Sequence, residues 1–237
     1  MAVLTSGFAA EKGDQLALAD DTQTRTWAEF DERVNRLIHS LRDAGVGAGD
    51  TIAVVSGNCN EWFETAFACS NNGMTYVPVN WHLVGPEIAY ILKDSGAKAI
   101  VVGHQFVDEV TRALADEGVE GIELVLVIGA PTTGRFQNFD DFVATGSAAE
   151  PDTQSFGGPM FYTSGTTGRP KGTDLPPTMF AGGQTVDDHL EALKQARFAE
   201  YGPHLVVGPM YHTGPLSGMR ILVAGTPSVI LGRFDAE

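Results

Sequence analysis

Short apolar segments alternate with helical patterns between residues 16 and 128, and this alternation limits the fold more than any other feature of the chain. Runs rich in Val, Ile and Leu predict buried strands, whereas apolar residues spaced three or four apart predict amphipathic helices. Strands and helices that alternate at this spacing form a largely parallel sheet covered by helices, so we predict an α/β fold. The expected strands are 16–19, 51–56, 76–79, 99–102 and 124–128, and the expected helices are 27–41, 60–72, 85–92 and 107–115.

The sequence predicts where several helices begin and end. Thr26 and Glu29 have the spacing of a capping box, in which each side chain binds the other residue's backbone N–H. Asn60 is the expected N-cap of the second helix. Gly45 and Gly96 each follow a helical pattern and predict its end, because glycine adopts the left-handed conformation that closes many helices.

The regular alternation stops at residues 130–157, which are rich in proline and glycine with a weak helical pattern near residues 139–143. We interpret this stretch as a linker or subdomain boundary. It divides the chain into a first α/β subdomain, residues 1–150, and the start of a second α/β subdomain, residues 151–237. In the second, strands are expected at 158–162, 205–207 and 228–231, and helices up to about residue 200 and at 216–223.

The 237 residues carry a formal net charge of −15, with no basic patch. This charge argues against nucleic acid and anionic membranes as partners. No apolar run approaches the length of a transmembrane segment.

The two cysteines, Cys59 and Cys69, lack metal-site or disulfide-framework spacing, which favours a reducing cytoplasm. The histidines are scattered, and no metal ligand is assigned.

Residues 162–172, with the sequence YTSGTTGRPKG, concentrate glycines, hydroxyls and two cations in one short loop. Glycines let the backbone turn and present its N–H groups, and the hydroxyls and cations add further donors and positive charge. These groups suit a phosphate chain, whereas the alternative is a polar surface turn. The phosphate loop, as we call its central residues, comprises Thr163, Ser164, Gly165, Thr166, Thr167, Gly168, Arg169, Pro170 and Lys171.

This loop differs from two common nucleotide-binding patterns. Pro170 stands where a Walker A loop has its second glycine. The glycine-rich run 45–49 follows a helix and precedes a strand, which reverses the order in a Rossmann turn. Instead, residues 162–172 resemble the phosphate-binding signature of the adenylate-forming enzymes, which include acyl-CoA synthetases, luciferases and amino-acid adenylation domains. The resemblance to acyl-CoA synthetases spans nearly the whole chain, including residues 26–102 and the PMYH motif at 209–212.

The resemblance implies the N-terminal domain of the acyl-CoA synthetase fold, with stacked, largely parallel sheets flanked by helices, here incomplete. It implies a ligase that uses ATP and Mg²⁺ to convert a fatty or other carboxylic acid into an acyl-adenylate, and coenzyme A to form the thioester. Residues Thr163 to Lys171 would hold the β- and γ-phosphates. Tyr211 and His212 would border the acid, although each could instead be an ordinary packed side chain. No acidic residue lies between Gly208 and Leu216 to bind an amino group, which favours a plain acid.

The chain also departs from the family pattern. Two prolines, Pro176 and Pro177, follow the loop where the next helix would begin. The family's adenine, ribose and magnesium motifs and its C-terminal domain have no counterpart here, so no residue is assigned as catalytic. We therefore expect an N-terminal fragment that is inactive alone and self-associates. The alternatives are a non-catalytic nucleotide- or partner-binding module, and an adenylating enzyme whose acceptor is a carrier protein or oxygen.

Overall fold

A computed structural model describes residues 5–163, 169–174, 191 and 202–233 of the chain. The helix expected to reach about residue 200 falls outside this described part. In chain order the elements are α1 (Ser6–Lys12), β1 (Leu16–Ala19), β2 (Thr24–Thr26), α2 (Trp27–Asp43), β3 (Thr51–Val55), α3 (Asn60–Asn71), β4 (Thr75–Pro78), α4 (Gly85–Ser95), β5 (Ala97–Gly103), the 3-10 helix η1 (His104–Phe106), α5 (Val107–Leu114), β6 (Leu124–Ile128), β7 (Phe136–Asn138), α6 (Phe139–Thr145), β8 (Met160–Thr163), β9 (Lys171–Asp174), β10 (His204–Val206), α8 (Thr213–Val223) and β11 (Ser228–Ile230).

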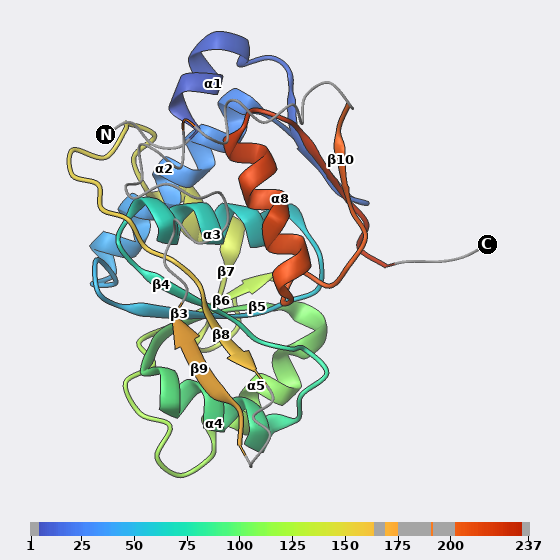
Figure 1. The fold of residues 1–237 in the computed structure, drawn as a ribbon. Coiled ribbons are helices and arrows are strands. Elements are labelled where there is room, and N and C mark those ends of the chain that lie inside the picture. Colours follow the sequence, from blue (N-terminus) through green and yellow to red (C-terminus); the bar gives the residue numbers. More distant parts are fainter. Residues whose placement is uncertain (1–4, 164–168, 175–190, 192–201, 234–237) are drawn as a thin grey trace.

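The largest sheet is five-stranded and parallel throughout, in the order β4-β3-β5-β6-β7. Helices α2 and α3 lie on one side of this sheet, and α4 and α5 lie on the other (Figure 1). The predicted α/β fold with a largely parallel sheet is therefore confirmed.

Alternate residues of the strands enter two separate cores. In β3, Ile52 and Val54 pack with α2 and α3, whereas Ala53 and Val55 pack with α4 and α5. All five residues of β3 are buried. A strand buried on both faces needs apolar residues at consecutive positions, which explains the continuous runs of Val, Ile and Leu in the sequence.

A second sheet joins the two ends of the chain. Its order is β10-β11-β1-β2, in which β1 pairs parallel with β11 and antiparallel with β2. Strand pairing therefore crosses residue 150, the boundary that we predict between two subdomains. The division itself remains a prediction.

The stretch 130–157 is more structured than the sequence indicates. Strand β7 pairs with β6 at the edge of the five-stranded sheet, and α6 packs Phe139, Phe142 and Val143 into the first core. The predicted linker is thus wrong for residues 136–145, although the weak helical signal near 139–143 is confirmed. The short elements α1, β2, β7 and β9 carry too little periodicity to be predicted from the sequence.

The predicted ends of α2 and α4 follow local chemistry. Thr26 and Glu29 form the predicted capping box at α2, and Gly96 ends α4 with φ 61°. The cap of α3 differs, because Cys59 occupies the N-cap position and Asn60 is the first helical residue. Asp20, from the turn between β1 and β2, accepts the N–H of Asn60 at 2.9 Å. A distant carboxylate therefore replaces the predicted local cap.

Helix α3 is buried along its whole length, and this burial encloses a charged group. The Glu64 carboxylate accepts two hydrogen bonds from Arg33 on α2, at 2.7 and 2.8 Å, and one from Arg25 on β2 at 3.2 Å. Its side chain is 1% exposed. A buried carboxylate depends on such partners, because they replace the water that burial removes.

We predict that Arg33→Ala lowers the free energy of unfolding by about 3 kcal/mol, because Glu64 then stays buried with Arg25 as its remaining cation. Glu32→Ala on the same helix, which removes an exposed partner of Arg36, should change it by at most about 0.5 kcal/mol. Urea denaturation followed by tryptophan fluorescence measures both. Equal losses in the two variants would contradict the role assigned to the buried pair.

Candidate active site

The base of the phosphate loop is an antiparallel hairpin formed by β8 and β9. Thr163 lies opposite Lys171, and Tyr162 lies opposite Gly172. Thr163, Arg169 and Lys171 are exposed. The structure therefore brings together the first and last predicted residues of the loop. The predicted residues between them, Ser164, Gly165, Thr166, Thr167 and Gly168, lie outside the described part of the chain.

The hairpin is attached to the edge of the five-stranded sheet. The backbone N–H of Tyr76 in β4 donates to the carbonyl oxygen of Gly158 at 3.1 Å, and Tyr76 forms a parallel bridge with Pro159. The residues that lead into β8 are thus paired with the edge strand of a buried sheet. This attachment gives the phosphate loop a rigid support.

Helix α4 holds the hairpin from one side. The Tyr90 hydroxyl donates to the carbonyl oxygen of Pro170 at 2.8 Å, and the guanidinium carbon of Arg169 lies 5.2 Å from the centre of the Tyr90 ring. The Tyr162 hydroxyl donates to the Asp94 carboxylate at 2.7 Å. Partial burial, and then the hydrogen bond and charge of Asp94, raise the pKa of Tyr162, so its hydroxyl remains a donor at neutral pH.

Neither Tyr90 nor Asp94 is predicted from the sequence as a site residue. A weak signal exists, because Tyr90 is a large aromatic residue placed beside the buried stripe of α4. Asp94 follows one turn later, so the two side chains share a helix face. The partners of Tyr90 and Asp94 lie 80 and 68 residues further along the chain, where periodicity provides no information.

Tyr211 and His212 lie between β10 and α8, in contact with other aromatic rings. The Tyr211 ring meets Trp81 edge to face at 6.4 Å, and Trp81 stacks on Phe106 at 5.2 Å between ring centres. The His212 ring lies 4.4 Å from Tyr211. His212 is exposed, and its side chain makes no capping hydrogen bond to α8. Tyr211 is half-buried, so one part of its ring remains accessible.

The carboxyl ends of three parallel strands supply the surroundings of this segment. Asn58 follows β3 and binds both the Gly208 carbonyl oxygen and the Met210 N–H, at 2.9 and 2.8 Å. Trp81 follows β4, and Phe106 follows β5. Ligands in α/β proteins bind at this edge of the sheet. His82 is exposed and lies 3.6 Å from Trp81 between ring centres.

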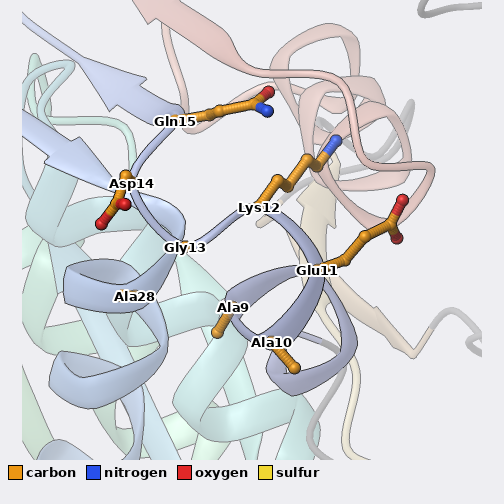
Figure 2. Close-up of a pocket in the computed structure, with 8 residues that line it drawn as sticks. All are labelled: Ala9, Ala10, Glu11, Lys12, Gly13, Asp14, Gln15 and Ala28. Atoms are coloured by element: carbon orange, nitrogen blue, oxygen red, sulfur yellow. The ribbon is translucent and has the colours of Figure 1, made fainter.

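A surface hollow beside α1 contains none of the predicted site residues. Figure 2 shows Lys12 extending from it toward α8. Lys12 donates to the carbonyl oxygen of Gly225, just beyond the end of α8, and its ammonium lies 4.9 Å from the centre of the Phe8 ring. We interpret Lys12 as a structural contact. The hollow is lined by Ala9, Ala10, Glu11, Lys12, Gly13, Asp14, Gln15 and Ala28.

The described residues contain no group of three or more His, Cys, Asp or Glu side chains arranged to hold a metal ion. The Mg²⁺ expected with ATP remains a prediction. Among the same residues, no helix has the length and apolar character needed to cross a bilayer.

The fold and the glycine-rich loop define an α/β domain of the adenylate-forming class. A family model described as AMP-binding enzyme matches residues 6–236, and the chain belongs to this family. The superfamily expected from the phosphate-loop sequence is thus confirmed.

Three known proteins illustrate the relationship. A feruloyl-CoA synthase from an Amycolatopsis species is 30% identical over 89% of this chain and 39% of its own. The fatty acid–[acyl-carrier-protein] ligase ScoC from Streptomyces coeruleorubidus is 30% identical over 72% of this chain and 32% of its own. The crystal structure of the anthranilate CoA ligase AuaEII, solved with anthranoyl-AMP, superposes with a TM-score of 0.82 and 20% identity, over 98% of this chain and 45% of that one.

These comparisons confirm the predicted fold, the N-terminal domain of acyl-CoA synthetases. The chain spans between about a third and two fifths of the length of the two curated relatives.

Proposed function

We propose that this chain takes part in the ATP-dependent activation of a carboxylic acid to an acyl-adenylate, followed by transfer of the acyl group to the thiol of coenzyme A. The observation that carries the proposal is the phosphate loop, which is held on a braced hairpin with Lys171 and Thr163 exposed at its base. Relatives named as feruloyl-CoA synthase and indoleacetate–CoA ligase support the same reaction class.

In the first step, a carboxylate oxygen of the acid bonds to the α-phosphorus of ATP while the bond from that phosphorus to the bridging oxygen breaks. Negative charge grows on the departing pyrophosphate. Donors placed around it stabilise the transition state more than the ground state. We assign this role to the phosphate loop, Thr163 to Lys171, whose described residues include the Lys171 ammonium and the Thr163 hydroxyl as donors.

In the second step, the thiol sulfur attacks the acyl carbon, AMP leaves with the electron pair of the mixed anhydride bond, and the thiol proton passes to solvent. The phosphate loop has no part in this step, because pyrophosphate has already departed. The phosphate loop therefore acts in the first step, the formation of the acyl-adenylate.

We assign Tyr211 and His212 to the border of the acid site. The accessible rings of Tyr211 and Trp81 offer an apolar surface to the acyl group, and His212 offers a polar group beside it. No acidic residue accompanies them in residues 208–216, so a plain carboxylic acid fits better than an amino acid. Relatives act on aromatic and on fatty acids by name, and we propose a fatty or aromatic acid as the substrate class.

A second candidate keeps adenylation and changes the acceptor. ScoC, one of the relatives, is named as a ligase that uses an acyl carrier protein. The alternative acceptor is therefore a carrier-protein thiol. An assay that compares coenzyme A with a carrier protein as the acceptor distinguishes the two candidates.

The free thiols of Cys59 and Cys69 fit the reducing cytoplasm that we propose as the location.

We predict that Lys171→Ala reduces acid-dependent ATP–pyrophosphate exchange by about 100-fold, because the growing charge on pyrophosphate loses the Lys171 ammonium. The variant is made in the longest form of the protein that the gene encodes. Lys98→Ala is the matched control, because Lys98 pairs with Asp50 at the opposite end of the sheet. Exchange that is undiminished in Lys171→Ala would rule out the assigned role.

We predict that His212→Ala changes the KM for the acid, or the preference among fatty and aromatic acids, with the KM for ATP unchanged. The reason is that His212 is exposed beside the aromatic rings and forms no cap that would give it a structural role. His39→Ala, which changes a half-buried histidine on α2, should leave both constants unchanged. A change in thermal stability alone would show that His212 is an ordinary packed residue.

A further inference from the structure

We propose that Tyr90 is a positioning residue for the phosphate loop, and that it gives the loop's two cations different roles: Arg169 anchors the loop to α4, and Lys171 contacts the phosphates. This inference rests on the proposed function, since it explains how the loop is held for that reaction. Tyr90 and Asp94 come from α4, which packs beside the hairpin of β8 and β9 (Figure 1).

Tyr90 contacts the loop in two ways with one side chain. Its hydroxyl binds the Pro170 carbonyl oxygen at 2.8 Å, and its ring lies under the Arg169 guanidinium at 5.2 Å. A guanidinium over an aromatic face is attracted by the negative potential of the ring. Stacking also restrains the plane of the guanidinium, so Arg169 is directed toward α4.

The Pro170 hydrogen bond also acts on the next residue. The carbonyl of Pro170 and the N–H of Lys171 belong to one planar peptide unit, so a bond to that oxygen orients both. Proline adds a fixed φ just before the unit. Tyr90 therefore sets the direction in which Lys171 leaves the loop and enters β9.

The alternation of side chains along the hairpin separates its two faces. Tyr162 and Gly172 are opposite each other and share one face, and Tyr162 reaches Asp94 on α4. Side chains one position further along a strand point to the other face. Thr163 and Lys171 therefore lie on the face directed away from α4, and both are exposed.

Gly172 supports this arrangement through its lack of a side chain. A Cβ there would lie 2.9 Å from the sulfur of Met160 and 3.2 Å from the Tyr162 ring. Tyr162 is thus packed directly over Gly172 on the α4 face. The anchored face of the hairpin is closely packed, whereas the opposite face presents Lys171 and Thr163 to a ligand.

The test is a double-mutant cycle between Tyr90→Leu and Arg169→Ala, read as affinity for tripolyphosphate with Mg²⁺ by calorimetry in 0.15 M salt, where distant exposed charges are screened. Each single change should weaken binding by about tenfold, and the double variant should also lose about tenfold, because both changes break one anchor. Tyr90→Phe keeps the ring under Arg169 and should lose roughly threefold, in line with one hydrogen bond.

A control on the same helix separates positioning from folding. Lys93→Ala removes the ion pair of α4 with Asp116 at 2.7 Å and does not touch the hairpin. It should leave tripolyphosphate affinity unchanged. In ATP–pyrophosphate exchange, Tyr90→Leu should raise the KM for ATP and leave the KM for the acid unchanged, a split that a general loss of structure does not produce.

Several results would overturn the inference. Losses that multiply to about 100-fold in the double variant would show that Arg169 contacts phosphate independently of Tyr90. Unchanged affinity in Tyr90→Leu would show that the anchor has no effect. If wild-type protein binds tripolyphosphate but shows no exchange with any acid, the proposed function fails while the cycle still decides the role of Tyr90. If it does not bind tripolyphosphate, both fail.

Discussion

The five-stranded parallel sheet must be covered on both faces, and the rest of the structure depends on this requirement. Val54 faces the core beneath α2 and α3, and its neighbour Val55 faces the core beneath α4 and α5. Because each parallel connection crosses over the sheet, the carboxyl ends of β3, β4 and β5 open at one edge. Asn58, Trp81 and Phe106 follow those three ends. Asn58 and Trp81 contact residues 208–212 there, and Phe106 stacks on Trp81. Burial of the sheet thus determines where a substrate site can form.

Burial also explains why distant segments depend on one another. Helix α3 is enclosed on all sides, so the Glu64 carboxylate needs cations from α2 and β2. The N-terminus of the same helix takes a carboxylate from Asp20. The β1–β2 segment that supplies two of these groups pairs with β11, near the far end of the described chain. These polar contacts join the second sheet to the core of the first.

The phosphate loop combines two kinds of information. Its glycines, hydroxyls and cations follow from residue type and are readable in the sequence, as is its place after a strand. The hairpin at its base is held by α4, through Tyr90 and Asp94. A loop rich in glycine has little preference for one direction, so a rigid neighbouring helix has to provide it. The same division holds at Tyr211, because its motif can be recognised in the sequence but its contact with Trp81 cannot.

The sequence by itself determined the alternation of strands and helices, the capping box at Thr26, the stop at Gly96 and the chemistry of residues 162–172. Each of these follows from a local preference of the backbone or from the functional groups of adjacent residues. Tertiary structure alone decided that β1 pairs with β11, that β7 completes the large sheet, that Asp20 caps α3 and that Tyr90 holds Pro170. Those contacts join residues far apart in the chain, and no local sequence pattern specifies which distant residue each of them contacts. Packing selects it, because every buried polar group and apolar face must find a partner at the same time.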